Sequence, residues 1–222
     1  MVATPPAAEL FAIILAGGAS SRLHATSPRP VVDKPLLEFE GQPLITRVLT
    51  ETARVVLAQA TVVVGPSSLP TGKIPTVSED PPQAGPYLAV RTGLQHFTRN
   101  AGASLEGQGV LLLAADMPWI GLGINALAAH HRDTAAEPQV AIIEADGHVQ
   151  PLLSYVPRTL ADQLFAEPIL NAGIWQALRD QSYRRIELAN QAGADIDTYQ
   201  DAVNHGIVFT DQDSLDRGDG RV

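Results

Sequence analysis

The sequence contains no cysteine among its 222 residues. Disulfide frameworks, thiol nucleophiles and zinc sites with cysteine ligands are therefore excluded for this chain. A chain without disulfides suits a reducing compartment, and we expect a cytoplasmic protein. The segment MVATPPAAEL has no basic stretch ahead of an apolar run, so we expect no secretory signal. No apolar run approaches the roughly 20 residues that a membrane-spanning helix needs.

Positive charge is also scarce. The chain has 15 lysine and arginine residues against 24 acidic residues, a formal net charge of −9. Proteins that bind DNA or RNA in general need a basic surface to neutralise phosphates. We therefore expect neither a nucleic-acid partner nor a membrane partner. Lys34 and Lys73 are the only lysines, so the place of each in the sequence is informative.

Apolar segments of two kinds alternate along most of the chain. Short runs such as LFAIIL, TVVV and GVLLLAA are typical of buried strands, and helical patterns lie between them. Such alternation predicts an α/β fold with a mainly parallel sheet covered on both faces by helices. We expect one domain over residues 1–209. Residues 210–222, TDQDSLDRGDGRV, have little apolar surface and are predicted to form a mobile acidic tail.

The segment that follows the first strand, LAGGASSRLHATSPRPVVDKPLL, combines glycine, serine and positive charge. No acidic residue occurs between Glu9 and Asp33, although the protein as a whole is acidic. An acid-free loop with Arg22 and Arg29, closed by Lys34, is consistent with a local anion site, and equally with an ordinary solvated loop. Because Pro28, Pro30 and Pro35 block regular helix, residues 16–35 are predicted to be loop.

Glycines allow a backbone to approach a ligand closely, and successive N–H groups can then surround phosphate oxygens. Gly17 and Gly18 fit this role, although an isolated Gly-Gly pair is more often a tight turn. Arg22 and Lys34 could add charge-assisted contacts to phosphates. The pattern is neither a P-loop, nor a dinucleotide-binding G-x-G-x-x-G, nor the G-x-S-x-G of hydrolases.

Three carboxylates are candidates for a metal site. Asp116 directly follows the apolar strand GVLLLAA, and ligands of parallel sheets bind at the carboxyl ends of strands. One or two carboxylates together with substrate phosphates are typical of a Mg²⁺ site. Asp195 and Asp197 alternate in GADIDTYQD and could supply a second ligand. Helix capping is the competing role for Asp116 and for Asp197 or Thr198.

Five segments, taken in order, resemble the signature of the MobA-like nucleotidyltransferases. They are LAGGASSRL…DKPLL with GQPLI, EDPPQAGPYLAVRTGL, LLLAADMPWI, GHVQPLLSYV and DIDTYQDAV. The resemblance covers about residues 11–205. It implies a Rossmann-like, three-layer α/β/α fold. The implied reaction is Mg²⁺-dependent transfer of a nucleoside monophosphate from a nucleoside triphosphate, with GTP favoured, to a phosphorylated acceptor such as molybdopterin. Pyrophosphate is released.

The resemblance also implies roles for individual residues. Arg22 and Lys34 would be the catalytic cations on the phosphates, and Asp116 with Asp195 or Asp197 would bind the metal. The nucleotide would lie against Leu15, Ala16, Gly17, Gly18, Asp80, Gly85 and Pro86. Gln150 and Pro151 would form the acceptor side.

Two features depart from the family pattern. Arg22 and Lys34 are twelve positions apart, which is wider than in the family, and His24 stands where the family has glycine.

Three hypotheses follow. The chain could be a nucleotidyltransferase for molybdopterin. It could run the same chemistry on a phosphosugar, phospholactate or methylerythritol phosphate. It could also be a degenerate member that binds nucleotide or a partner without turnover.

Overall fold

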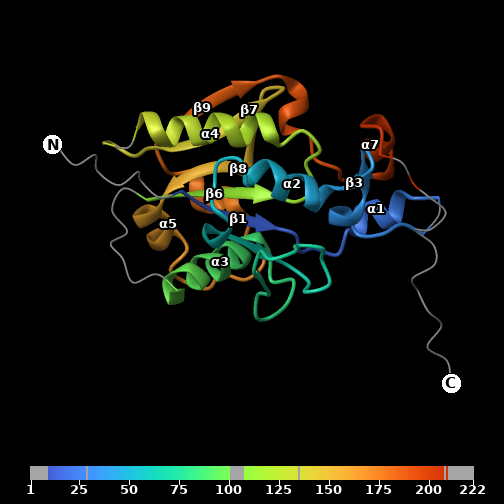
Figure 1. The fold of residues 1–222 in the computed structure, drawn as a ribbon, viewed down its shortest axis with the longest axis horizontal. Helices are drawn as coiled ribbons and strands as arrows, with labels where there is room; N and C mark the ends of the chain where they lie inside the picture. The colour runs from blue at the N-terminus through green and yellow to red at the C-terminus, as the bar shows by residue number, and fades with distance from the viewer. Residues whose placement is uncertain (1–9, 29, 101–107, 135, 208, 210–222) are drawn as a thin grey trace.

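A computed structural model describes residues 10–28, 30–100, 108–134, 136–207 and 209. These residues form a seven-stranded sheet in the order β5-β4-β1-β6-β8-β7-β9 and a separate two-stranded ribbon, β2-β3 (Figure 1). The strands are β1 Leu10–Leu15, β2 Glu38–Phe39, β3 Gln42–Pro43, β4 Thr61–Val64, β5 Thr76–Val77, β6 Gly109–Ala114, β7 Val140–Ala145, β8 His148–Pro157 and β9 Tyr183–Leu188.

Helices connect most of these strands. They are α1 Ser21–Thr26, α2 Leu44–Thr52, α3 Pro86–Asn100, α4 Gly121–Asp133, α5 Arg158–Leu164, α6 Ile174–Leu178 and α7 Tyr199–Asn204. Three short 3-10 turns complete the set: η1 Lys34–Leu36, η2 Ala58–Ala60 and η3 Asn190–Gly193. No helix of the described segments is long and apolar enough to cross a membrane.

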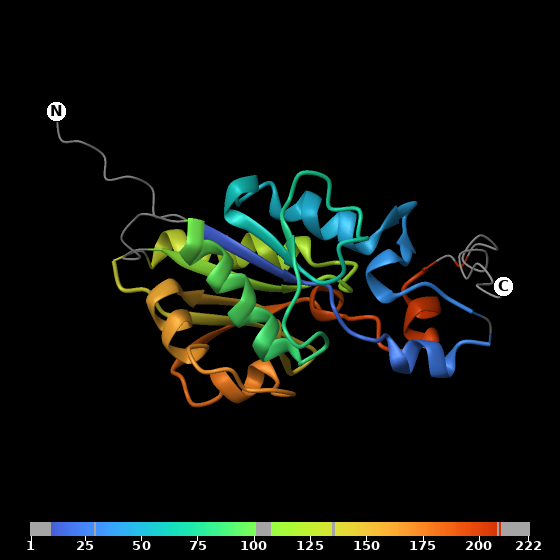
Figure 2. The same ribbon diagram turned by 90° about the horizontal axis from the view of Figure 1, so that it is seen from below.

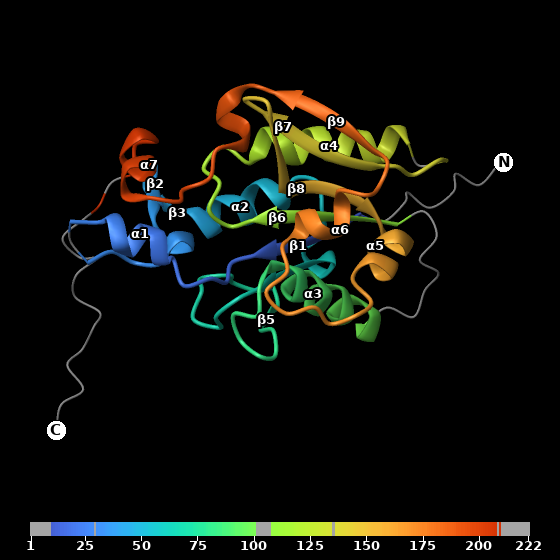
Figure 3. The same ribbon diagram turned by 180° about the vertical axis from the view of Figure 1, so that it is seen from behind.

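The helices lie on both faces of the large sheet. Helices α2 and α4 pack on one face, and α3, α5 and α6 pack on the other (Figures 2 and 3). Strands β1, β4, β5 and β6 are parallel to one another, and β8 alone runs against its neighbours β6 and β7. The predicted three-layer α/β/α fold with a mainly parallel sheet is confirmed.

The reversed strand β8 follows β7 through a two-residue turn. Asp146 and Gly147 both have positive φ, at 52° and 71°. These are the backbone conformations of the tight hairpin turn that Asp-Gly favours. The dipeptide was therefore the signal for an antiparallel pair.

Two separate hydrophobic cores hold the chain together. The main core fills both sides of the large sheet and includes every residue of β1 and β6 except Gly109. A small core lies beyond the carboxyl end of the sheet, where α1, α7 and the β2-β3 ribbon gather (Figures 1 and 3). We define the small core as its buried members: Leu23, Val31, Leu37, Phe39, Leu44, Ile196, Ala202 and Ile207.

The predicted loop over residues 16–35 is wrong in part, because Ser21–Thr26 forms α1. The prolines act only after this helix. Ser27, which precedes Pro28, is extended (φ −76°, ψ 131°), as expected for a residue before proline. Leu23 anchors α1 in the small core with no exposed surface. Arg29 and residues 210–222 lie outside the described residues, so the domain boundary at residue 209 stays a prediction.

Candidate nucleotide site

Two loops meet at the carboxyl edge of the sheet because their strands are parallel neighbours. β1 and β6 pair along their whole length, with Leu15 opposite Ala114. The N–H of Ala115 then donates to the carbonyl of Leu15 at 3.0 Å, beyond the last pair. The glycines after β1 and Asp116 after β6 are therefore brought to one place.

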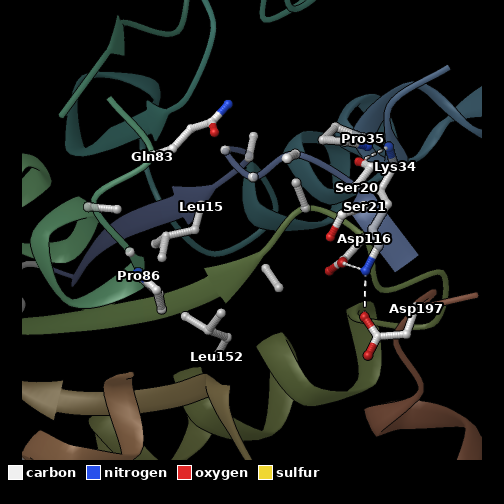
Figure 4. A pocket seen from close by; sticks show the side chains of 18 of the residues that line it. Leu15, Ser20, Ser21, Lys34, Pro35, Gln83, Pro86, Asp116, Leu152 and Asp197 are labelled. Carbon is white, nitrogen blue, oxygen red and sulfur yellow. Dashed lines mark hydrogen bonds and ion pairs between the residues drawn. The ribbon is translucent and has the colours of Figure 1, made fainter. Parts of the chain in front are cut away.

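A cavity of about 670 Å³ opens at this edge. Figure 4 shows side chains from both ends of it. Its lining comprises residues 15–22, Lys34, Pro35, Glu79, Gln83, Gly85, Pro86, Ala89, Ala114, Ala115, Asp116, Leu152 and Asp197. The predicted site residues Leu15, Ala16, Gly17, Gly18, Arg22, Lys34, Gly85, Pro86, Asp116 and Asp197 all lie on this one surface.

One end of the cavity is charged. The Lys34 ammonium lies between two carboxylates, 2.5 Å from Asp197 Oδ1 and 3.5 Å from Asp116 Oδ2 (Figure 4). The guanidinium of Arg22 is 2.5 Å from the other Asp197 oxygen, Oδ2. Lys34 is half-buried, with 15% of its side chain exposed, whereas Arg22 is 74% exposed. Two cations therefore converge on a single carboxylate at the mouth of the site.

The surroundings of the carboxylates shift their pKa values in different directions. Burial raises the pKa of Asp116 to about 6, although the Lys34 ammonium acts to lower it. Burial also raises the pKa of Asp195, and the nearby Asp197 charge adds to this effect. For Asp197, burial acts upward, but Lys34 and Arg22 outweigh it and hold its pKa below the usual range. Asp116 is thus a carboxylate whose ionised form needs more positive charge than Lys34 alone supplies.

Local contacts close the long segment between Arg22 and Lys34. The Lys34 N–H donates to Ser20 Oγ at 3.0 Å, so the segment returns to its starting point. Thr26 Oγ1 donates to the Arg22 carbonyl at 2.8 Å and accepts from the Tyr199 N–H at 3.0 Å. The segment is therefore folded against α7, and the twelve-residue spacing still places both cations at one carboxylate.

His24 does not disturb the glycine-rich turn, because it lies within α1. The left-handed backbone conformations fall elsewhere, at Gly18 (φ 119°) and Ser20 (φ 47°). The His24 ring faces Asp33, with Nε2 3.5 Å from Oδ1. His24 therefore occupies a helical position, where the backbone does not require glycine.

The opposite end of the cavity carries no lysine or arginine among its described residues. It is lined by Gly85, Pro86, Gln83 and Glu79. Gly85 has φ 99°, and a Cβ there would come within 3.1 Å of the Asn171 backbone, so glycine is required on both grounds. Asp80, expected in this region, is not part of the lining.

Glu79, one residue earlier, takes that place and was missed by sequence reasoning. It is 8% exposed, and its Oε1 accepts a hydrogen bond from the Gln83 N–H at 3.1 Å. The sequence did contain a signal, because Glu79 and Asp80 are adjacent acidic residues. In an extended segment their side chains point in opposite directions, so either one could have faced the cavity.

Three other predicted residues lie outside the nucleotide cavity. Gln150 and Asp195 line a second, smaller cavity, and Pro151 lines neither. Asp197 faces Lys34 in the nucleotide cavity, whereas Asp195 lies outside this lining, although its charge still acts to raise the pKa of Asp116.

The described side chains contain no cluster of three or more His, Cys, Asp or Glu arranged to hold a metal ion. A magnesium ion bound together with a triphosphate does not require such a cluster, because phosphates and waters complete its shell. Asp116 and Asp197 share one ammonium between them, and Asp116 has a raised pKa that a divalent cation would reverse. The pair therefore fits a metal that arrives with its nucleotide.

Solved structures of low sequence identity share the fold. Rv0371c of Mycobacterium tuberculosis H37Rv, solved in complex with manganese, matches with a TM-score of 0.63 at 16% identity over 89% of this chain and 97% of its own. Molybdopterin-guanine dinucleotide biosynthesis protein A of Archaeoglobus fulgidus gives 0.58 at 18% identity over 87% and 95%. The 4-diphosphocytidyl-2C-methyl-D-erythritol synthase of Anaerococcus prevotii gives 0.55 at 12% identity over 90% and 97%.

The comparison with curated proteins gave no match. A family model does match, over residues 12–186, and it describes the MobA-like NTP transferase domain. The matched range contains Leu15, the glycine-rich loop, Lys34, Glu79, Gly85 and Asp116, which line the cavity. This chain belongs to the MobA-like NTP transferase family.

Proposed function

We propose that the protein transfers a nucleoside monophosphate, with GTP as the favoured donor, to a phosphorylated acceptor and releases pyrophosphate. The observation that carries this proposal is the convergence of Lys34, Asp116 and Asp197 beside the glycine-rich loop. A cavity of about 670 Å³ is large enough for a nucleotide. Its lysine and arginine side chains are confined to one end, which gives a bound nucleotide a direction.

The phosphates belong at the charged end. The backbone of Gly17 and Gly18 can approach them closely, and Lys34 and Arg22 supply positive charge. The ribose and base then extend toward Gly85 and Pro86, where the lining carries no cation. Glu79 is a carboxylate at this end, so it can accept hydrogen bonds from ribose hydroxyls or from N–H groups of a base.

Asp116 and Asp197 would hold the magnesium ion that enters with the nucleotide. When bound, the ion neutralises phosphate charge and polarises the phosphoryl oxygens. Lys34 and Arg22 would exchange their contact with Asp197 for contacts with the phosphates. Catalysis then consists of positioning and electrostatic stabilisation, with no covalent intermediate on the protein.

The acceptor is the less defined substrate. Molybdopterin is our first hypothesis, on the strength of the Archaeoglobus fulgidus protein and the family name. Other neighbours are named for a methylerythritol derivative and for mannose 1-phosphate, so phosphorylated sugars are open alternatives.

One observation favours a second candidate function, nucleotide or partner binding without turnover. Asp197 engages both Lys34 and Arg22, the two cations that a triphosphate would need. If that contact persists when nucleotide binds, the phosphates lose their positive partners.

Thermal unfolding separates these candidates. The protein is heated with GTP, CTP, ATP or UTP, each with and without Mg²⁺, and pyrophosphate release is then assayed with the best nucleotide. A ligand at about 100 times its dissociation constant adds about 2.7 kcal/mol of stability. We expect a Mg²⁺-dependent rise in melting temperature with GTP, followed by acceptor-dependent pyrophosphate release. A rise without release for any acceptor would favour nucleotide binding without turnover. No rise would reject nucleotide binding and transfer, and would leave partner binding as the second candidate.

A further inference from the structure

A second cavity, of about 380 Å³, lies where the β7-β8 hairpin faces the segment before Asp195. Its polar lining consists of Asp146, His148 and Gln150 from the hairpin side, with Gln191, Asp195 and His205 opposite. None of these residues contributes to the nucleotide cavity.

The two cavities are neighbours. Asp195 lines the second and Asp197 the first, and the N–H of Ile196 between them donates to the Asp116 carbonyl at 3.2 Å. On β8, Gln150 lines the second cavity and Leu152 the first. A molecule that reaches from one cavity to the other therefore passes close to Asp116.

The chemistry of the two linings is opposite. The nucleotide cavity has two cations, Arg22 and Lys34. The described lining of the second cavity has two carboxylates, two imidazoles and two side-chain amides, with neither lysine nor arginine. Carboxylates accept hydrogen bonds from hydroxyl, amine and amide groups, and they repel other anions. This lining suits a neutral group that is rich in O–H or N–H donors.

We propose that the second cavity holds the part of the acceptor remote from its phosphate, and that this part is neutral and donor-rich, with no carboxylate or second phosphate. This inference rests on the proposed function and narrows its acceptor class. It favours a neutral sugar phosphate or a phosphorylated nitrogen heterocycle over a phosphorylated carboxylic acid.

The transfer itself is balanced without an added reactant. An oxygen of the acceptor's dianionic phosphate forms a bond to the α-phosphorus of the nucleoside triphosphate. The bond from that phosphorus to the bridging oxygen of the β-phosphate breaks, and the electron pair leaves with pyrophosphate. The products are pyrophosphate and a diphosphate diester, in which a phosphoanhydride bridge joins the acceptor to the nucleoside, with total charge unchanged and no proton transferred.

The test uses acceptor pairs that differ only by hydroxymethyl against carboxylate. Glucose 1-phosphate is compared with glucuronic acid 1-phosphate, and glycerol 3-phosphate with 3-phosphoglycerate. The phosphate ester of 6-hydroxymethylpterin is the N–H-rich probe. With the nucleotide that raises the melting temperature, we expect a neutral probe to give at least a tenfold higher kcat/KM than any carboxylate probe. Which neutral probe is used best distinguishes a sugar phosphate acceptor from a phosphorylated heterocycle.

Two matched variants on one segment locate the effect. Asp195→Asn should raise the acceptor KM at least fivefold and change the nucleotide KM less than Asp197→Asn does, because the Asp195 charge also acts on Asp116. Equal use of a carboxylate probe overturns the inference, as does turnover of no probe by protein that binds nucleotide. An Asp195→Asn effect on the nucleotide KM alone overturns it too. Failure to bind any nucleotide would instead reject the proposed function, and the inference with it.

Discussion

The main core and the small core contribute different parts of the nucleotide site. The sheet edge of the main core presents the glycine-rich turn and Asp116, at the ends of strands that are buried along their whole length. The segments that carry the cations and Asp197 are fastened by the small core, which contains eight buried residues. The geometry of the nucleotide site therefore depends on how firmly the small core is held against the main core.

The largest effect is expected from Lys34→Met, which removes the ammonium shared by the two carboxylates. Losing one preorganised charged group from such a site costs about 100- to 1,000-fold in kcat. Steady-state pyrophosphate release measures this change. Lys73→Met is the control, because Lys73 is exposed and outside the cavity. Equal activity of the two variants would remove Lys34 from the site.

Leu23→Ala should loosen the small core and leave the main core in place. Leu23 is fully buried, and truncation of a buried leucine costs about 2–5 kcal/mol. Hydrogen exchange should then speed up over residues 21–39 and 196–207 and stay slow over residues 109–114. Leu111→Ala, at a fully buried position of β6, is the comparison and should lower protection across the sheet. Identical exchange patterns in both variants would mean that the two cores unfold as one.

Asp116→Asn should stabilise the protein without nucleotide at neutral pH. The pKa of Asp116 is raised from 3.8 to about 6, so its ionised form is disfavoured in the folded state. The free energy of unfolding therefore falls as pH rises from about 4 to 6. Above that range, ionised Asp116 lowers it by roughly 2–3 kcal/mol. The variant should melt higher at pH 7.5 and like the parent at pH 4. A lower melting temperature at pH 7.5 would contradict this reading of Asp116.

Thr26→Val should have the smallest effect. It removes a hydroxyl that joins α1 to the first residue of α7, and a hydrogen bond of this kind contributes about 1 kcal/mol. We expect a melting temperature a few degrees lower and a modest rise in nucleotide KM. Thr50→Val is the control, since the Thr50 hydroxyl donates to the Thr46 carbonyl within the same helix, α2. A KM shift as large in the control would show that the α1-α7 contact has no special role.

The parts of the fold that rest on local patterns could be predicted from the sequence. Buried apolar strands, the Asp at the end of β6 and the stop of α7 near Gly206, whose φ is 75°, all follow from short-range rules. The reversed strand β8 was open to prediction from Asp146-Gly147, but it was not predicted. Helix α1 was not predicted, because Pro28, Pro30 and Pro35 favoured a loop over the whole of residues 16–35. The helix ends at Thr26, before the first of these prolines.

The remaining features depend on contacts between distant segments. The choice of Asp197 over Asp195 follows from the path of the chain after Ile196, which is buried in the small core. The replacement of Asp80 by Glu79 depends on which face of one loop turns toward Gly17. Neither could be predicted from spacing, since both members of each pair are acidic.

Hydrogen exchange with and without Mg²⁺ and GTP tests most directly the claim that both cores build one nucleotide site. The account predicts added protection at residues 15–20 and 114–116 of the sheet edge, together with residues 21–36 and 196–204 around the small core. Protection confined to the sheet edge, with the small core unchanged, would contradict it, because Lys34, Arg22 and Asp197 would then have no part in holding the nucleotide.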